Sequence, residues 1–421
     1  MPKEKKLIPE LRFPEFAKSA EWEVKTLEEV CDVYRGSTFS KADMNENGLV
    51  SCIHYGELFT KYNEVILSVS SKTNKEDSFK SKVGDILMPS SDVTPDGLAK
   101  ASAIMLDDVV LGGDMNILRP KENSNSIFLS YLLNHSKSEI IKLVSGTTVK
   151  HIYPSQIITC QLPIAKDKKE QQKIASCLSS LDEVITAHSQ KLELLKNHKK
   201  GLMQNLFPQE GEKVPKLRFK EFEKDGEWEE KSLDEVCKLV RGPFGGELKK
   251  EIFVKEGYAV YEQSHAIYSD FSSFRYYIDE DKFSELKRFS VKSGDLIMSC
   301  SGTMGKFAII PQDYKNGVIN QALLKLTVKK GYDNLFIKIT LETENNQNNL
   351  LSQSAGGAIK NVVSVSQIKE LRLQIPSINE QQKIASCLSA LDELITEQAK
   401  KIEQLKQHKK GLMQGLFPKM N

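Results

Sequence analysis

The chain has 421 residues, which is too long for one ordinary hydrophobic core and suits two to four domains. With 39% hydrophobic and 28% charged residues it has a globular composition, and no run approaches the roughly 18 to 20 apolar residues of a membrane helix. A net charge of +2 gives only weak support for nucleic-acid binding, so a DNA-binding surface would have to be local or partly supplied by partners. Because the N-terminal segment lacks the apolar core of a signal peptide, we expect a cytoplasmic protein without membrane contact.

The two halves of the chain repeat each other over almost their full length. The corresponding segments are 11–36 with 217–242, 82–88 with 292–298, 145–157 with 354–368, and 170–208 with 380–418. The stretches 37–81 and 243–291, by contrast, share almost nothing. A repeat that keeps its frame while its loop-rich interiors diverge indicates one shared mechanical part and two different recognition surfaces.

Each half begins with a globular segment and ends in a long helix. Short apolar runs separated by turns, with a helical pattern near 126–143 and another near 334–351, indicate an α+β fold for both globular segments. We therefore divide the chain into four parts: a first globular domain (1–166), a first long helix (167–208), a second globular domain (209–376) and a second long helix (377–421).

The long helices carry a narrow apolar seam at alternating spacings of four and three, the period of a coiled coil. The seam residues are Ile174, Leu178, Leu181, Ile185, Leu192, Leu195, Ile384, Leu388, Leu391, Ile395, Ile402 and Leu405. His188, Gln398, Lys199 and Lys409 interrupt the seam and would help to set its register. We expect an antiparallel pair within one chain; a zipper between two chains is the alternative.

The spacing of Asp167 to Glu170, and of Ser377 to Glu380, predicts a capping box at the start of each long helix. In a capping box, the glutamate side chain reaches back to the amide of the capping residue.

No catalytic constellation is found in the sequence. The segment "SGTMGK" lacks the Gly and the Ser or Thr that a phosphate-binding loop requires at 300 and 307, where Cys300 and Phe307 stand. There is no G-x-S-x-G elbow, no strand-coupled G-x-G-x-x-G and no Pro-Pro dipeptide of the kind found in amino methyltransferases. Seven dispersed cysteines without a Cys-x-x-Cys pair argue against a structural metal. We expect neither an enzyme nor a metal site in this chain.

The chain resembles the specificity subunits of type I restriction-modification systems. The resemblance is carried by the two E-Q-Q-K-I-A-x-x-L-x-x-L-D segments that begin at Glu170 and Glu380, by the two G-D-(I/L)-(L/I)-M strands, and by the G-x-x-x-x-(N/H)-(I/V) stretches before the long helices. It covers nearly the whole chain except the loop interiors. It implies two target-recognition domains separated by an antiparallel pair of helices, each domain reading one half of an asymmetric, bipartite DNA target.

The resemblance also implies the partners. Two modification (methyltransferase) subunits, which carry S-adenosylmethionine, would dock on the helices, and restriction subunits, which are ATP-dependent translocases and nucleases using ATP and Mg, would join for cleavage. This chain would hold no cofactor of its own and would bind double-stranded DNA. A structural adaptor with two protein-binding domains on the same helices is the alternative.

Loop residues at equivalent places of the two halves are the candidate DNA contacts, since hydroxyl, amide and cationic side chains bind phosphates and base edges alike. They are Arg35, Lys41, Thr94, Lys100, Thr148 and Lys150 in the first half, and Arg241, Lys249, Lys250, Thr303, Lys306, Lys360 and Asn361 in the second. We further expect DNA binding by the chain alone to be weak and strongly dependent on salt.

Overall fold

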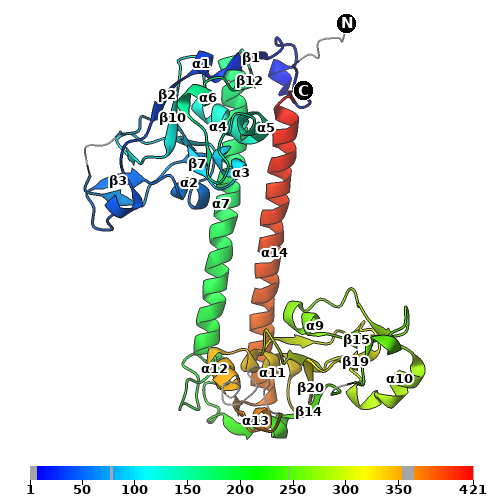
Figure 1. Cartoon of the computed structure of the whole chain (residues 1–421). Helices are drawn as coiled ribbons and strands as arrows, with labels where there is room; N and C mark the ends of the chain where they lie inside the picture. Colours follow the sequence, from blue (N-terminus) through cyan, green and yellow to red (C-terminus); the bar gives the residue numbers. More distant parts are fainter. Residues whose placement is uncertain (1–6, 76–78, 245, 353–364, 421) are drawn as a thin grey trace. The chain divides into compact units, whose positions relative to one another are not determined.

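The structure is a computed structural model that describes residues 7–75, 79–244, 246–352 and 365–420 (Figure 1). It contains two compact units. The first unit comprises residues 1–190 and 399–421, and the second comprises residues 191–398. Both long helices, α7 (Lys168–Asn205) and α14 (Ile378–Leu416), therefore contribute one stretch to each unit.

The first unit is built around a five-stranded sheet in the order β2-β10-β6-β8-β4, in which β10 runs antiparallel to both β2 and β6. Three smaller sheets, β5-β3-β9, β1-β12 and β11-β7, complete it. The strands are β1 (Glu23–Thr26), β2 (Cys31–Arg35), β3 (Val50–Ile53), β4 (Val65–Ile66), β5 (Lys72–Thr73), β6 (Ile86–Pro89), β7 (Ser91–Asp92), β8 (Ser102–Ile104), β9 (Val110–Leu111), β10 (Met115–Pro120), β11 (Lys150–His151) and β12 (Gln161–Ile164). The short helices are α1 (Leu27–Val30), α2 (Glu57–Thr60), α3 (Pro95–Leu98), α4 (Ser126–His135), α5 (Lys137–Ile141) and α6 (Pro154–Ile157).

The second unit repeats this plan with a four-stranded sheet, β14-β20-β17-β18, and a three-stranded sheet, β16-β15-β19. β13 pairs with β21 as β1 pairs with β12. The strands are β13 (Glu229–Ser232), β14 (Cys237–Arg241), β15 (Tyr258–Tyr261), β16 (Tyr277–Ile278), β17 (Leu296–Ser299), β18 (Phe307–Ile309), β19 (Gly317–Ile319), β20 (Leu323–Val328) and β21 (Arg372–Ile375). The short helices are α8 (Leu233–Val236), α9 (Gln263–Tyr268), α10 (Glu280–Glu285), α11 (Asn334–Leu341), α12 (Glu344–Ser352) and α13 (Val365–Lys369).

The helical stretch expected late in each globular segment is two short helices instead of one. α4 ends where the backbone of Ser136 leaves the helical region, with φ −89° and ψ 34°, and α5 follows at once. In the second unit α11 ends before Glu342 and α12 begins at Glu344. The helical stretch is interrupted at these positions, a feature that an amphipathic pattern alone does not reveal.

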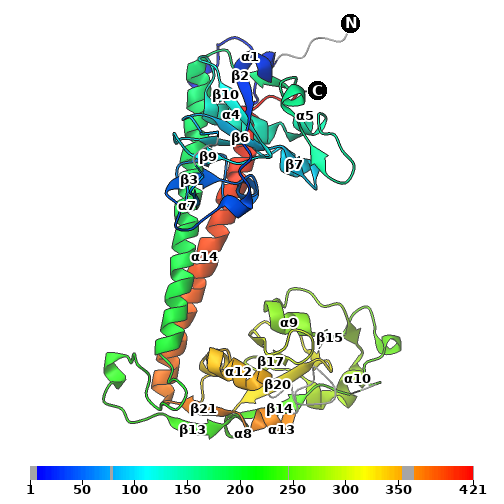
Figure 2. The same ribbon diagram turned by 60° about the vertical axis from the view of Figure 1, so that its left-hand side comes forward.

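In each unit, one stretch of α7 and one stretch of α14 run antiparallel, as Figures 1 and 2 show for each unit taken by itself. In the first unit, Ile174 and Leu178 near the start of α7 share a hydrophobic core with Leu416 and Phe417 at the end of α14. This arrangement confirms the α+β fold class with an antiparallel helix pair inside one chain.

The second unit pairs the helices in the same antiparallel sense with their roles exchanged. Ile384 and Leu388 near the start of α14 share a core with Leu206 and Phe207 at the end of α7. The first turns of α7 therefore belong to the core of the first unit and its end belongs to the core of the second. For α14 the order is reversed: its first turns belong to the second unit and its end to the first. All twelve predicted seam residues are buried or half-buried.

Aromatic rings anchor the end of each long helix in the globular segment of its unit. Phe417 lies 6.3 Å from Trp22 and 5.7 Å from Phe128 between ring centroids. In the second unit Phe207 lies 6.1 Å from Trp228 and 5.7 Å from Phe336. The phenylalanine of the repeated Leu-Phe-Pro at the end of each long helix therefore packs into a cluster of aromatic rings.

The repeated Glu-Gln pair at the start of each helix fastens it to the preceding domain. Glu170 accepts hydrogen bonds from Nε and Nη2 of Arg12 at 2.7 and 2.8 Å, and Glu380 accepts the equivalent bonds from Arg218 at 2.8 and 2.7 Å. The predicted capping boxes are therefore wrong in the role of these glutamates. A bidentate, charge-assisted pair with a guanidinium is stronger than the single bond to an amide that a capping box offers.

The glutamine of the same motif bridges three elements. Gln171 donates to the carbonyl of Ala165 at 2.8 Å and accepts from the amide of Asn125, which caps α4, at 2.9 Å. Gln381 makes the same two bonds with Pro376 and Asp333, the latter capping α11. Each long helix is thereby joined to the segment before it and to the start of a core helix.

Candidate nucleic-acid interface

In the first unit, polar loops gather at one edge of the main sheet. Arg35 ends β2 and pairs with Asn116, while Pro89 ends β6 and pairs with Met115. Because β10 is antiparallel to both neighbours, the ends of β2 and β6 lie at the same edge as the start of β10. The guanidinium of Arg35 lies 3.6 Å from the carboxylate of Asp114 at this edge.

The short sheet of β7 and β11 joins two of the predicted loops at this edge. Lys150 pairs with Asp92, and the amide of Ile152 donates to the carbonyl of Ser90 at 3.1 Å. Thr94 caps α3: its hydroxyl donates to Asp92 at 2.7 Å and accepts from the amide of Gly97. The structure thus brings Arg35, Thr94 and the loop holding Thr148 and Lys150 into one neighbourhood.

Lys41 and Lys100 differ in their availability to a ligand. Lys41 is exposed, at the start of the short 3-10 helix Lys41–Asp43. Burial of the His54 ring lowers the pKa of His54; the charge of Glu57 opposes this effect and the charge of Lys41 adds to it. Lys100, by contrast, follows α3 in the sequence and is half-buried. Burial lowers the pKa of its ammonium group, although the charge of Glu64 opposes this effect. Lys41 is therefore the better placed of the two for contact with a phosphate.

The second unit forms the same edge. Arg241 ends β14 opposite Leu324, and Ser299 ends β17 opposite Leu323. The hydroxyl of Ser299 donates to the carbonyl of Thr303 at 2.6 Å and accepts from the amide of Lys306 at 3.1 Å. These bonds close the loop between β17 and β18 into a tight turn that exposes the side chains of Thr303 and Lys306.

The remaining predicted contacts of the second half divide into two groups. Lys249 and Lys250 are exposed at the 3-10 helix Lys250–Ile252, whose Ile252 packs against the β15-β16-β19 sheet. Lys360 and Asn361 lie outside the described residues. None of the thirteen predicted contacts is tested by a bound ligand, so they stay predictions.

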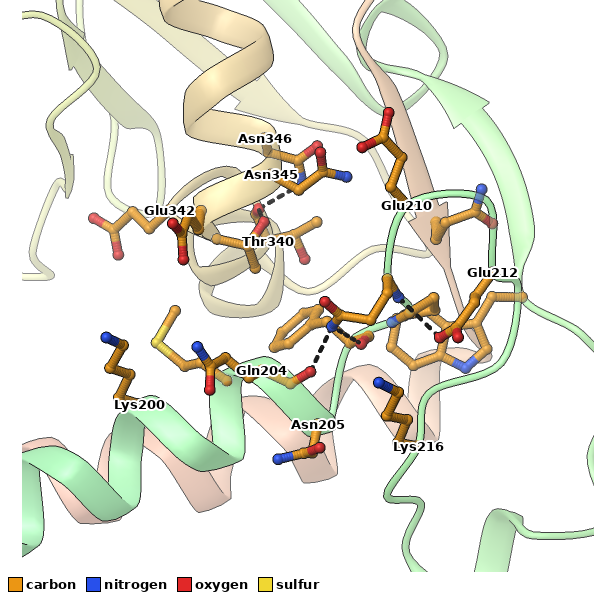
Figure 3. Close-up of a pocket in the computed structure, with 18 of the residues that line it drawn as sticks. Lys200, Gln204, Asn205, Glu210, Glu212, Lys216, Thr340, Glu342, Asn345 and Asn346 are labelled. Carbon is orange, nitrogen blue, oxygen red and sulfur yellow. Dashed lines mark hydrogen bonds between the residues drawn. The ribbon is translucent and has the colours of Figure 1, made fainter.

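A cavity of about 950 Å³ in the second unit lies among the end of α7, the segment that follows it, and α11 and α12 (Figure 3). None of the predicted contacts that the structure describes lines it. As many carboxylates as cations surround it: Glu210, Glu212, Glu230, Glu342, Glu344 and Asp392 face Lys196, Lys199, Lys200, Lys213, Lys216 and Arg372. Such balanced charge does not suit a track for a polyanionic backbone.

Within residues 7–75, 79–244, 246–352 and 365–420, no group of three or more His, Cys, Asp or Glu side chains could hold a metal ion. Within the same ranges, no helix combines the length and the apolar character needed to cross a bilayer.

Comparison with known proteins identifies the family. The family described as type I restriction modification DNA specificity domain matches twice, over residues 19–197 and 225–407. The chain belongs to this family. The two matched ranges each contain one globular segment and most of the long helix that follows it, so the family's unit is the repeat itself.

Relatives of this family are similar along most of the chain. The putative type I restriction enzyme MjaX specificity subunit of Methanocaldococcus jannaschii is 25% identical, covering 94% of this chain and 93% of that protein. The MjaVIII specificity subunit of the same organism is 24% identical, covering 70% of this chain and 69% of that protein. The S subunit of a type I restriction-modification system from M. genitalium shares the fold, with a TM-score of 0.63 and 17% identity over 98% of this chain and 100% of that chain.

Recognition of a DNA target sequence in a type I restriction-modification system is therefore the function of the chain. Nothing supports the alternative of an adaptor that does not bind DNA. As a specificity subunit, the chain is a component of a restriction-modification complex. The sequence did not predict the Arg12–Glu170 and Arg218–Glu380 pairs, which hold the helices. The one signal for them is that an arginine stands at equivalent positions of the two halves.

Proposed function

We propose that each globular segment reads one half of an asymmetric, bipartite DNA target through the sheet edge that carries Arg35 in the first unit and Arg241 in the second. One observation carries the proposal: the two edges are built by the same strand pairings and present different loops. Identical frames explain why both halves bind the same kind of ligand, and divergent loops explain why the two half-sites differ in sequence.

The two long helices supply equivalent faces to two copies of one partner. Gln172 and Ser176 on α7 correspond to Gln382 and Ser386 on α14, and all four are exposed. Identical exposed side chains at equivalent positions of two helices are what a face that binds two copies of one partner would require. The partner proposed for this face is the modification subunit, with restriction subunits joining the complex for cleavage.

The chemistry belongs to those partners. The modification subunit would bind S-adenosylmethionine and methylate adenine, and the restriction subunit would use ATP and Mg, while this chain supplies no catalytic group or cofactor. Such a complex works on DNA in the cytoplasm. Methylation of a base in duplex DNA requires the base to leave the stack, so the assembled complex should distort its DNA.

The test is to express the chain with its modification subunits in cells that lack other methyltransferases and to map methylated adenines. The proposal expects one bipartite motif with an unspecified spacer that places the half-sites about one helical turn apart, roughly 34–36 Å. Methylation without a common motif, or a motif unchanged when the second globular segment is exchanged for that of a relative, would refute it. Methyl transfer by the purified chain alone would refute the assignment of chemistry to the partners.

A further inference from the structure

Each unit contains the same backbone arrangement, here called the corner, next to the sheet edge that carries Arg35 or Arg241. In the first unit β3 runs parallel to β9, and the carbonyl of Ile53 accepts from the amide of Gly112 at 2.9 Å. In the second unit β15 runs parallel to β19, and the carbonyl of Tyr261 accepts from the amide of Asn320 at 2.9 Å. Gly112 and Asn320 are therefore equivalent positions.

A second pair of hydrogen bonds extends this equivalence. The amide of His54 donates to Oε2 of Glu57 at 2.9 Å, and the amide of Glu262 donates to Nδ1 of His265 at 2.9 Å. Each bond joins the amide of a residue before a short helix, α2 or α9, to a side chain three residues later in the first turn of that helix. His54 therefore corresponds to Glu262, and the residues that follow them, Tyr55 and Gln263, correspond to each other.

The corner adjoins the arginine at the end of the edge strand in both units. A Cβ added to Gly36, next to Arg35, would lie 1.8 Å from the carbonyl oxygen of Gly112. A Cβ added to Gly242, next to Arg241, would lie 1.9 Å from the carbonyl oxygen of Asn320. Only glycine permits this approach, so each corner is held against its arginine strand.

The same backbone carries different side chains in the two units. The first unit presents His54, Tyr55 and a glycine, with the His54 and Tyr55 rings 4.5 Å apart. The second presents Glu262, Gln263 and Asn320, which line a cavity of about 520 Å³ together with Arg275. Where the first unit has a pair of aromatic rings, the second unit has two amides, a carboxylate and a guanidinium.

Existing contacts hold these polar groups in place while leaving donors for a ligand. Oε1 of Gln263 accepts from the hydroxyl of Ser301 at 2.8 Å, so the amide nitrogen is the group of this side chain that remains to donate to a ligand. Oδ1 of Asn320 accepts from the amide of Ala322 at 3.0 Å in the same way.

Arg275 is positioned from two sides. Its Nη2 donates to Oε1 of Glu262 at 2.9 Å, and its guanidinium lies over the ring of Tyr276, 4.4 Å from the centroid. The arginine side chain is 69% exposed, so its remaining donors are open to a ligand.

The chemistry of the cavity fits base edges better than phosphates. Planar amides pair with adenine N6 and N7, a guanidinium pairs with guanine O6 and N7, and a carboxylate accepts from the amino group of cytosine. The carboxylate of Glu262 would repel a phosphate at the same place. We propose that Gln263, Arg275 and Asn320 are specificity-determining residues whose cavity takes base-pair edges in the major groove of the half-site read by the second unit; this rests on the proposed function.

The experiment uses the full chain assembled with its modification subunits. The affinity of the complex is measured for its mapped target and for targets scrambled in one half-site, which gives a discrimination ratio for each half. In Gln263→Ala with Arg275→Ala, the ratio for the second half-site should fall by about tenfold or more, while the ratio for the first half-site stays unchanged.

Gln312→Ala is the matched control. This exposed glutamine follows the end of β18, which pairs with the start of β17, whereas Ser299 lies at the opposite end of β17. Unchanged ratios at both half-sites in the Gln263→Ala, Arg275→Ala variant overturn the inference and leave the proposed function intact. A fall in affinity for all sequences alike, with both ratios preserved, also overturns it, because the residues then bind the backbone. If the complex with the unaltered chain shows no discrimination at either half-site, the proposed function itself fails.

Discussion

Lys409 of α14 lies 2.7 Å from Asp182 of α7 in the first unit, and the equivalent Lys199 of α7 lies 2.5 Å from Asp392 of α14 in the second. The aspartate is the last residue of the repeated E-Q-Q-K-I-A-x-x-L-x-x-L-D segment. Only an antiparallel arrangement in this register places it beside a lysine of the other helix in both units. The two ion pairs therefore fix the register that the apolar seam alone leaves open.

The two lysines have different surroundings. Lys409 is 13% exposed and also lies 3.0 Å from Glu64, while the hydroxyl of Tyr131 donates to Asp182 at 2.5 Å. Burial raises the pKa of Asp182, against the opposing hydrogen bonds from Lys409 and Tyr131. In the second unit Asp392 is 51% exposed. Loss of the lysine would therefore leave a desolvated carboxylate only in the first unit.

We predict that Lys409→Met destabilises the first unit by about 3–5 kcal/mol, the cost of stranding one member of a buried ion pair. Lys199→Met, the matched substitution in the second unit, should cost less than about 1 kcal/mol because its partner is half in water. Urea denaturation combined with hydrogen exchange, which assigns the change to a unit, checks this. Equal losses in the two variants would contradict the role given to burial.

We predict that Glu380→Ala releases the start of α14 from the second globular segment. The carboxylate is 1% exposed and its partner Arg218 is 7% exposed, so its removal should cost about 3–5 kcal/mol. Amide exchange in the first turns of α14 should accelerate strongly. Lys383→Ala is the control, since it removes only a half-exposed pair with Glu221 and should leave exchange unchanged. Slow exchange in Glu380→Ala would show that apolar packing alone holds the helix.

We predict that only Cys177 and Cys387 react quickly with a thiol reagent in the folded chain at pH 8. Both are half-exposed at equivalent positions of the long helices. Burial raises the pKa of Cys31, Cys160 and Cys237 to about 12, and that of Cys52 and Cys300 to about 11, so their thiolates are scarce. Mass spectrometry of the labelled chain identifies the sites. Protection of both cysteines by the modification subunit would support docking on the helices.

We predict that Lys249→Ala with Lys250→Ala weakens DNA binding by the assembled complex about equally for all sequences. Each lost phosphate contact should reduce the slope of log affinity against log salt by about one. Fluorescence anisotropy at several salt concentrations measures the slope. Lys238→Ala, an exposed lysine near the other end of β14, should leave it unchanged. A change of sequence preference in the double variant would instead mean that these lysines contact bases.

Much of the architecture could be predicted from patterns that are local in the chain. The seam spacing from Ile174 to Leu195 predicts a long helix without knowledge of its partner, because side chains four and three apart share one helix face. The repeat predicts two similar units, and the stretches that differ between the halves predict where recognition residues lie. The role of the repeat glutamates could not be predicted in this way, because their partners, Arg12 and Arg218, lie far away in sequence, where no local rule applies.

What the order of residues alone established is therefore the repeat, the helices with their seam and the α+β class. The tertiary structure alone decided which residues meet. The end of α7 packs into the core of the second unit and the end of α14 into the core of the first. Gln263, Arg275 and Asn320 line one cavity beside Arg241. The physical reason is that these contacts depend on strand pairings such as β15 with β19, which join residues far apart in the chain. Turn length and hydrophobic period do not specify such pairings.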